Sequence, residues 1–572
     1  MRRTTEELFL KVATFNILWT TVCLVLSAIL FFVDITIQWF TFPLMTVVAG
    51  AIYLRWFWDK KKDWRGILLG ASLVAVAVLL SYLVFNIHWD GNTYHKTAIG
   101  LLMDGWNPIE MDCTAVLPAD KVTDGIRYNA QWINHYANGG WILSAVWGAF
   151  FQNIEIGKAV NLLHMVSVFG VLFWYLSKKL KSRGWTFVVA GLTVFNPITV
   201  SQVESFYIDG SLYLYLLLGV LAMLMLSDKN CEIPKRYPIM FLFSSIVYCI
   251  NIKFTGMAYI GIFCIGFYLC WLYAGFKNGR LKEVFAKATL MFVGMAAFAI
   301  LVVGYSSYVC NVIEKGNLLY PLVGAEKIDI MDYSEPNTFD ERSSVEKSLV
   351  SFFGKTENLT NSSKEEPQLK IPFTVSLSEI KSCMYTDARI GGFGPWFSGI
   401  FIISAILAVS LVKNVRKKDS LLALEWSVTL IIALLMLLFF PASWWARYSA
   451  YIYFYVLSAL FYLAKKCEEG FGEHAKAKRV LSQIFSVAVL LNTMCFLLAP
   501  AAGAYLSIEI WQDKKELQQA VESDKELEIY CPTKQMTGIF WNLDCWGISY
   551  SATDSKIDGN HAYNDKIVWT KK

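Results

Sequence analysis

The sequence predicts an all-α polytopic membrane protein with about thirteen transmembrane helices, and three observations support this. Hydrophobic residues make up 56% of the 572 residues and only 17% are charged, whereas about 25% of a soluble globular chain is charged. Apolar runs long enough to cross a bilayer, which takes about 20 residues, recur along most of the chain. Lys and Arg cluster in alternate connections between these runs, as the positive-inside rule requires.

Each apolar run is interpreted as one span. Residues 1–11 are polar, and no small-residue cleavage site follows the first apolar run, so we expect that run to be retained in the membrane. The predicted spans lie at 9–33, 39–57, 66–87, 157–177, 185–201, 209–226, 239–255, 257–275, 288–309, 396–412, 421–440, 449–464 and 481–503.

The basic clusters fix the predicted orientation. They lie at 60–65, 178–183, 229–236, 277–287, 413–418 and 465–479, so these connections and the N-terminus are predicted to be cytoplasmic. Two polar loops, 88–156 and 310–395, then lie outside, as does the C-terminus. The predicted domains are a transmembrane domain at 1–503 and a non-cytoplasmic tail at 504–572.

The stretch 139–152 (GGWILSAVWGAFFQ) is apolar but short for a crossing. We expect an interfacial amphipathic helix within the first outer loop. Counting it as a span would invert every later connection and place the basic clusters outside.

Charge and cysteine usage exclude several classes of function. The net charge of +5 is small for this length, and a nucleic-acid partner would call for a concentrated basic face. His88, His95 and His135 have no metal-ligand spacing and are treated as non-ligands, and no Cys pair or Cys/His spacing suggests zinc. Cys531 and Cys545 form a disulfide if the tail is outside, or remain two free thiols.

The segment 88–95 (HWDGNTYH) begins where the third span leaves the membrane. Asp90 is therefore expected at the outer interface, where a carboxylate can take a proton from an acceptor hydroxyl while a lipid-borne donor stays in the bilayer. Tyr94 and His95 are candidate substrate-binding residues beside it. In the alternative interpretation, Asp90 only caps the helix that follows.

A second acidic group follows the fifth span. Pro197 is expected to kink or end that helix near the outer face. Glu204 and Asp209 then lie at the same membrane level as Asp90 and are candidate substrate-binding residues. Ordinary polarity at a span boundary explains the same pattern.

Lys253 and Arg447 are the only basic residues in the short outer turns. A guanidinium can bind a phosphate through two hydrogen bonds, and the alternative is that both side chains snorkel to ordinary lipid phosphates. The second outer loop carries 316–321 (GNLLYP) and 387–396 (DARIGGFGPW), and Arg389 completes the candidate substrate-binding residues.

These segments resemble those of a known family. Asp90, Tyr94 and His95, with Gly-Trp-Asn-Pro at 105–108, look like the first outer loop of GT-C-fold membrane glycosyltransferases. This group includes the protein O-mannosyltransferases and the bacterial aminoarabinose transferase. In it, an acidic residue follows an early span and an interfacial helix crosses the loop, here 139–152. The chain departs from the simplest pattern in having an extra hairpin of spans at 9–57 and a short tail.

The resemblance implies inverting sugar transfer from a polyprenyl-phosphate-linked donor to a glycan, lipid or protein acceptor outside a bacterial cell membrane. Asp90 would be the general base, Glu204 and Asp209 would orient substrate, and Arg447 with Lys253 would hold the donor phosphate. Related enzymes with monophosphate donors can work without a metal, so the resemblance implies neither a metal nor another cofactor.

Three other functions remain open from the sequence. One is a glycan polymerase or ligase that uses a diphosphate-linked oligosaccharide. Another is a non-enzymatic lipid or polysaccharide transporter, although a transporter should carry ionisable residues near the middle of its spans. The last is a protein whose aromatic outer loops only bind a partner.

Overall fold

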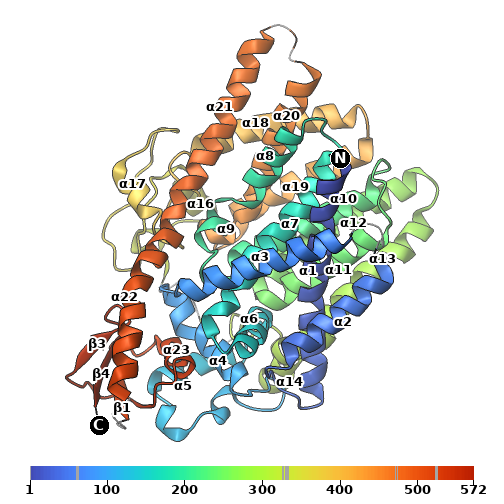
Figure 1. Cartoon of the computed structure of the whole chain (residues 1–572). Helices are drawn as coiled ribbons and strands as arrows, with labels where there is room; N and C mark the ends of the chain where they lie inside the picture. The colour runs from blue at the N-terminus through green and yellow to red at the C-terminus, as the bar shows by residue number, and fades with distance from the viewer. Residues whose placement is uncertain are drawn as a thin grey trace.

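The computed structural model describes residues 2–58, 63–324, 327–328, 334–470, 472, 474–521 and 526–571, and the chain folds into a bundle of helices with a small sheet at one end (Figure 1). Residues 60–62 of the first basic cluster and parts of the second outer loop lie outside the described residues.

Every predicted span contains a helix. Within the described residues, nine helices are long and apolar enough to cross a membrane, so the chain is a polytopic membrane protein; the count of about thirteen stays a prediction. The helices found in the predicted spans, together with α22, which continues the last one, are α1 (Arg2–Phe32), α2 (Thr41–Trp56), α3 (Asp63–Leu83), α7 (Ala159–Ser177), α8 (Arg183–Val194), α10 (Asp209–Ser227), α11 (Arg236–Ile252), α12 (Phe254–Lys277), α13 (Leu281–Phe298), α18 (Phe397–Arg416), α19 (Ser420–Phe439), α20 (Tyr453–Glu469), α21 (Ala475–Met494) and α22 (Leu498–Val521).

The fifth predicted span is interrupted, as Pro197 indicated. Helix α8 ends at Val194 and the short α9 (Pro197–Ser201) begins three residues later. Asn196 caps α9 in a capping box: its side chain accepts from the backbone N–H of Thr199, and the Thr199 hydroxyl oxygen accepts from the backbone N–H of Asn196. The chain therefore turns at the outer end of α8 before it reaches Asp209.

The outer loops contain short helices. The first loop holds η1 (Gly91–His95), α4 (Lys96–Met103), α5 (Asp124–Ile133) and α6 (Gly139–Phe151), and η4 (Ile154–Lys158) leads into α7. The second holds α14 (Cys310–Lys315), α16 (Ser344–Phe353) and α17 (Leu377–Ser382).

Helix α6 is the predicted interfacial helix, but the prediction that it is amphipathic is wrong. Residues around its whole circumference are buried, among them Trp141, Ala145 and Gly148. It packs against α1, α2, α4 and α11. An apolar helix without a polar face is stable only when it is covered on all sides, so α6 is part of the core beneath the outer loops.

The two ends of the spans separate clearly in Figure 1. The N-terminus lies toward the upper right, the α12–α13 turn at the right and the start of α21 at the top, whereas α5 and the C-terminus lie at the bottom and α17 at the left. These are the two groups of connections that the basic clusters predict for opposite faces of the membrane. Which face is cytoplasmic stays a prediction.

The last helix does not stop at the predicted domain boundary. Helices α21 and α22 form one apolar helical stretch, Ala475–Val521, that continues past residue 503. A sheet of four strands follows, in the order β2-β1-β4-β3. Its strands are β1 (Leu527–Tyr530), β2 (Tyr550–Thr553), β3 (Asn560–Ala562) and β4 (Ile567–Lys571), with α23 (Phe540–Cys545) between β1 and β2. Only β1 and β2 pair in parallel. The sequence analysis did not predict this sheet.

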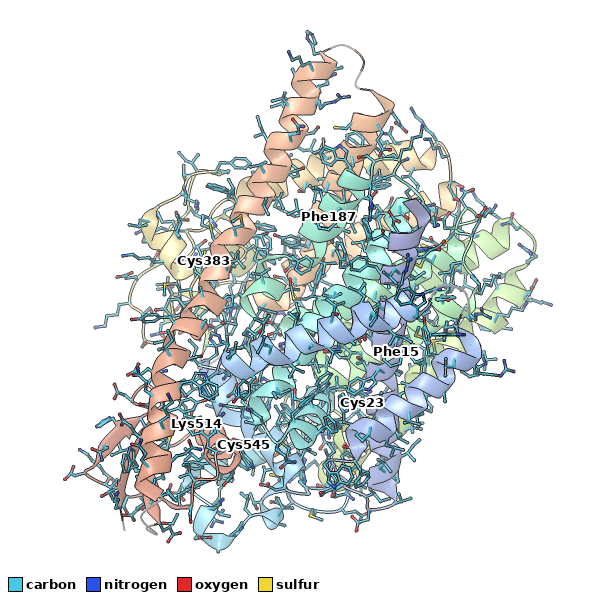
Figure 2. The ribbon with its side chains drawn as sticks, in the orientation of Figure 1. Phe15, Cys23, Phe187, Cys383, Lys514 and Cys545 are labelled. Carbon is cyan, nitrogen blue, oxygen red and sulfur yellow. The ribbon has the colours of Figure 1, made fainter. Side chains whose placement is uncertain are left out.

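The segment 526–571, here called the C-terminal region, packs against α22 and the first outer loop. Lys514 of α22 lies 5.8 Å from the Trp546 ring centroid, close to Cys545 (Figure 2). The Thr97 and Thr537 hydroxyl oxygens are 2.8 Å apart, and the Trp541 indole N–H donates to Asp104 at 2.8 Å. The tail is therefore continuous with the core.

Gly100 provides a test of this packing. A Cβ atom there would lie 2.1 Å from the buried Trp541 ring, so we expect Gly100→Ala to lower the free energy of unfolding by about 1–3 kcal/mol through overpacking. Gly191→Ala on α8 is the matched control, because no atom lies within 4 Å of its added Cβ. Thermal unfolding in detergent measures both; equal melting temperatures for Gly100→Ala and the wild type would contradict the packing.

Candidate functional site

Asp90 lies just before η1, at the outer end of the chain segment that leaves α3. Its carboxylate makes no capping hydrogen bond to η1, so the interpretation of Asp90 as a helix cap is wrong. The carboxylate instead accepts a hydrogen bond from Arg447 Nη1 at 3.0 Å, although 357 residues separate the two in sequence. An early helix and a late turn thus meet at one ion pair.

Arg447 belongs to the turn between α19 and α20 and is buried, with 6% of its side chain exposed. Its Nη1 also lies 3.8 Å from Asp209 Oδ2. The guanidinium carbon is 4.0 Å from the Trp445 ring centroid and 5.0 Å from that of Tyr207. Buried between acids and aromatic rings, Arg447 does not snorkel to bulk lipid, and that alternative is wrong for it.

Lys253 occupies the tight turn between α11 and α12. Its Nζ donates to Asp209 Oδ1 at 2.6 Å and lies 3.7 Å from the Tyr448 ring centroid. With 8% of its side chain exposed, Lys253 does not snorkel either. Asp90, Asp209, Lys253 and Arg447, here called the charged cluster, carry two negative and two positive charges.

One donor of Arg447 is unused. Within the described residues, its buried Nε has no hydrogen-bond partner. A buried N–H without a partner costs about 1–3 kcal/mol, more for a charged group. The Nε–H group is therefore available to an acceptor atom of a bound molecule.

A cleft of about 850 Å³ opens beside the charged cluster. Tyr207, which contacts Arg447, lines it together with Trp89, the neighbour of Asp90. The second outer loop supplies most of the remaining wall, which includes Asp387 and Arg389, and α22 contributes Ala502 and Leu506. The His88 Nε2 and Thr386 Oγ1 atoms, 2.7 Å apart, join the two loops at the cleft.

Arg389 is held in place at the cleft. It donates from Nε to the Ser334 carbonyl and from Nη1 to Asn358 Oδ1, each at 2.9 Å. Its guanidinium carbon lies 4.9 Å from the centroid of the Trp445 ring that Arg447 also contacts. The two arginines therefore flank one aromatic side chain.

Asp387 was missed by the sequence analysis. It lines the cleft, and burial raises the pKa of its carboxyl, although Arg447 and Arg389 oppose this. Its position as the first residue of the Asp-Ala-Arg segment at 387–389 was the available signal.

Tyr94 and His95 lie behind the charged cluster. Trp141 Nε1 donates to His95 Nδ1 at 2.7 Å, and the Tyr94 and His95 ring centroids are 4.3 Å apart. Burial lowers the pKa of His95 to about 4, so the ring is neutral at pH 7 and cannot act as a cation toward a phosphate. Substrate binding by either residue stays a prediction.

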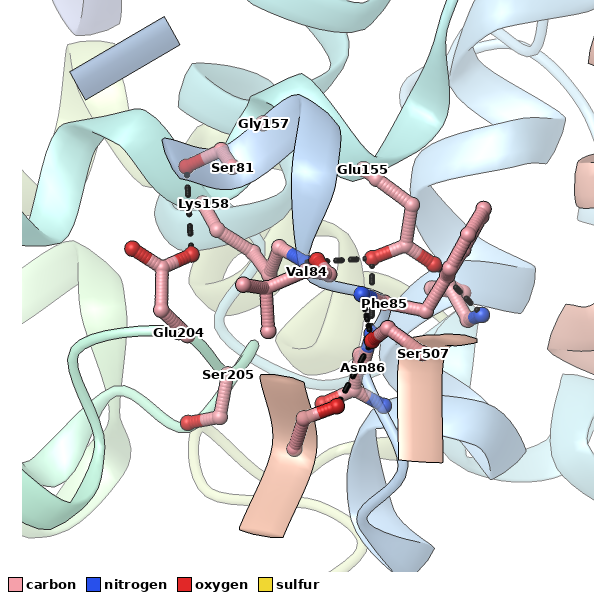
Figure 3. Close-up of polar contacts among 12 residues, drawn as sticks. Ser81, Val84, Phe85, Asn86, Glu155, Gly157, Lys158, Glu204, Ser205 and Ser507 are labelled. Carbon is pink, nitrogen blue, oxygen red and sulfur yellow. Dashed lines mark hydrogen bonds and ion pairs between the residues drawn. The ribbon is translucent and has the colours of Figure 1, made fainter. Parts of the chain in front are cut away.

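Glu204 is not brought to the charged cluster. Ser81 Oγ donates to its Oε2 at 3.5 Å, and Figure 3 shows it facing Lys158. Burial raises the pKa of the Glu204 carboxyl to about 7, against the attraction of Lys158. A role for Glu204 in orienting substrate stays a prediction.

Two further predictions concern metals and cysteines. Among the residues that the structure describes, no group of three or more His, Cys, Asp or Glu side chains is placed to hold a metal ion. Cys531 and Cys545 are both free thiols, so the disulfide alternative is wrong.

The chain has partial structural likenesses to solved proteins, two of which follow. No family model matches the chain, and no curated protein matches it. ArnT from Cupriavidus metallidurans, solved with bound undecaprenyl phosphate, is similar over 86% of this chain and 87% of its own, with 10% identity and a TM-score of 0.45. The Archaeoglobus fulgidus oligosaccharyltransferase in its apo form is similar over 85% of this chain and 60% of its own, with 13% identity and a TM-score of 0.40. Because both TM-scores are low, the chemistry of the site has to be judged from its own side chains.

The raised pKa of Glu204 makes a testable contribution to stability. The pKa of Glu204 is 4.5 in the unfolded chain and about 7 in the folded chain, so between these pH values the folded chain keeps a proton that the unfolded chain has lost. The free energy of unfolding therefore falls as pH rises through this window. Glu204→Gln should remove that part of the fall and be more stable than the wild type above pH 7. Unfolding midpoints across the window measure the difference, with the exposed Glu110→Gln as control; parallel wild-type and Glu204→Gln curves would contradict it.

Proposed function

We propose that the chain is a membrane glycosyltransferase that moves a sugar from a polyprenyl-phosphate-linked donor to an acceptor on the outer side of the membrane. The observation that carries the proposal is the Asp90–Arg447 ion pair beside the cleft. The pair joins a carboxylate that can accept a proton to a cation that can receive a leaving phosphate, and such a transfer needs both groups.

Arg447 is suited to hold the donor phosphate. Its unpaired Nε offers a hydrogen bond, and a guanidinium binds phosphate oxygens through two parallel hydrogen bonds. As the bond between the anomeric carbon and the phosphate oxygen breaks, negative charge develops on that oxygen. A fixed cation in a site with little water stabilises this charge more strongly than solvent does.

Asp90 is suited to be the general base. In the described structure its carboxylate is paired with Arg447, so a phosphate that binds Arg447 competes for the same donor. The released carboxylate then accepts the proton of the acceptor hydroxyl. The acceptor oxygen forms the new bond to the anomeric carbon from the face opposite the phosphate, and the configuration inverts.

Asp209 and Lys253 keep the arginine in position. Asp209 accepts from Lys253 at 2.6 Å and lies 3.8 Å from Arg447. When a phosphate displaces Asp90, Asp209 remains as a counter-ion that fixes the guanidinium. Asp90 can thus separate from Arg447 while Asp209 stays beside it.

A second candidate function is favoured by Arg389. This additional guanidinium lines the same cleft, and two arginines suit a diphosphate-linked oligosaccharide donor as used by a polymerase or ligase. Transfer from diphosphate-linked but not monophosphate-linked lipids would establish this alternative.

Asp90→Asn tests the base. The amide keeps the shape of the side chain but cannot take up the acceptor proton, so we expect transfer to fall by at least about a hundredfold while donor binding persists. Membranes containing each variant are incubated with a panel of undecaprenyl-phosphate-linked radiolabelled sugars, and labelled product is counted. Asp120→Asn, an exposed carboxylate of the same loop, is the control. Full activity of a folded Asp90→Asn variant would eliminate the base.

Arg447→Ala tests phosphate binding. Loss of charge-assisted hydrogen bonds should weaken undecaprenyl phosphate binding about tenfold or more. Native mass spectrometry of the detergent-solubilised protein measures occupancy as the lipid is titrated. Arg342→Ala, which removes a partly exposed arginine of the second outer loop, should bind as the wild type does. Equal affinity of Arg447→Ala and the wild type would rule out the phosphate role.

A further inference from the structure

The chain segment that leads to Asp90 has no regular secondary structure, and other elements hold it in place. Val84, Phe85 and Asn86 lie between α3 and η1 and are all buried. Lys158 Nζ donates to the Val84 carbonyl. The Phe85 N–H donates to Ser507 Oγ at 2.8 Å and the Asn86 N–H to Glu155 Oε2 at 2.9 Å (Figure 3).

Buried backbone groups need hydrogen-bond partners, and here three side chains replace the neighbours that a helix or strand would provide. Glu155 and Lys158 lie in η4, which leads into α7, and Ser507 lies in α22. Three consecutive residues are thereby fixed only four positions before Asp90.

Asn86 connects the fixed segment 84–86 to the turn that contains Asp90. Its Nδ2 donates to the His88 carbonyl at 3.2 Å, and Asn92 Nδ2 donates to the Asn86 carbonyl at 3.1 Å. A Cβ atom on Gly91 would lie 2.3 Å from Asn86 Nδ2. Because Asn86 packs directly against the residue after Asp90, a shift of Asn86 must displace the turn.

Glu155 is itself held at both carboxylate oxygens. Lys158 Nζ donates to Oε2 at 2.6 Å, and Lys96 Nζ donates to Oε1 at 3.0 Å. From the C-terminal region, Asn542 Nδ2 also donates to Oε1 at 3.0 Å. Lys96 Nζ contacts the Tyr563 hydroxyl oxygen at 3.0 Å as well.

The side chains of Glu155, Lys96 and Lys158 are 0% exposed. Two ammonium groups without the carboxylate between them would be left as uncompensated buried charges, which is strongly destabilising. Glu155 is therefore held between the two lysines, and the backbone of 84–86 bonds to Glu155 and Lys158 in the same cluster.

We infer that Glu155 is a positioning residue for Asp90, and that the C-terminal region holds Glu155 through Asn542 and Tyr563. What Asp90 does rests on the proposed function, whereas its placement by Glu155 does not. The C-terminal region thus helps to set the geometry of a site in the first outer loop, through one side chain of α23 and one of the turn between β3 and β4.

Glu155→Gln is the sharpest test. The amide turns a donor toward Asn86 N–H or a lysine, so segment 84–86 loses its anchor and the Asp90–Arg447 pair should open. The readout is the rate at which a water-soluble carbodiimide with glycine ethyl ester labels Asp90, followed by peptide mass spectrometry of the full-length protein. We expect about tenfold faster labelling, the population change that corresponds to losing one hydrogen bond to a charged group.

Asp104→Asn is the matched control, because Asp104 also bonds the C-terminal region, through Trp541, but does not contact segment 84–86. It should label Asp90 at the wild-type rate even if its melting temperature falls. Wild-type labelling in folded Glu155→Gln would overturn the inference, as would equal acceleration in Asp104→Asn.

Should Glu155→Gln not fold, Ser507→Ala gives the same measurement, because it removes only the partner of Phe85 N–H; we expect about threefold faster labelling, and no acceleration would overturn the inference. The labelling needs no substrate. A fully active Asp90→Asn variant would therefore defeat the proposed function and leave the positioning of Asp90 intact.

Discussion

The ion pair between Asp90 and Arg447 is the interaction on which the site depends. It joins the first outer loop to the turn before α20 across 3.0 Å. Such a pair is stable in a buried setting only when the remaining hydrogen-bonding capacity is also satisfied. Asp209 lies close to Arg447 as a second acid, and Lys253 donates a hydrogen bond to Asp209. The aromatic rings of Trp445 and Tyr207 lie against the guanidinium. The unpaired Nε is the exception, and in the proposed function it donates to the donor phosphate.

The same physical constraint organises the surroundings of the pair. The chain has to leave α3 and turn into η1 inside the protein, where water cannot pair its backbone. Glu155, Lys158 and Ser507 provide the hydrogen-bond partners of this backbone. The Glu155 carboxylate in turn accepts hydrogen bonds from Lys96, Asn542 and Tyr563. A buried network of this kind couples elements that are far apart in sequence, so the C-terminal region and the catalytic candidate are parts of one structure.

Particular residues show how far the sequence could be interpreted. Hydropathy located a helix in every predicted span, and Pro197 marked the end of α8. The same pattern failed for α6, because an apolar stretch of this length does not reveal whether it lies on a membrane surface or inside the fold. Asp90, Asp209, Lys253 and Arg447 were selected from their residue types and membrane level. Glu155 and Lys158 were not, although a charged pair at the start of an apolar run was a visible signal.

By itself, the sequence determined that this chain crosses the membrane many times and which of its loops share a face, because the cost of burying charge and unpaired backbone in lipid is set by local composition. Only the tertiary structure decided which charges meet. Asp90 is 357 residues from Arg447, and Glu204, also a carboxylic acid, instead accepts a hydrogen bond from Ser81. Contacts of that kind depend on how helices pack against one another, which residue type and spacing along a single chain do not specify.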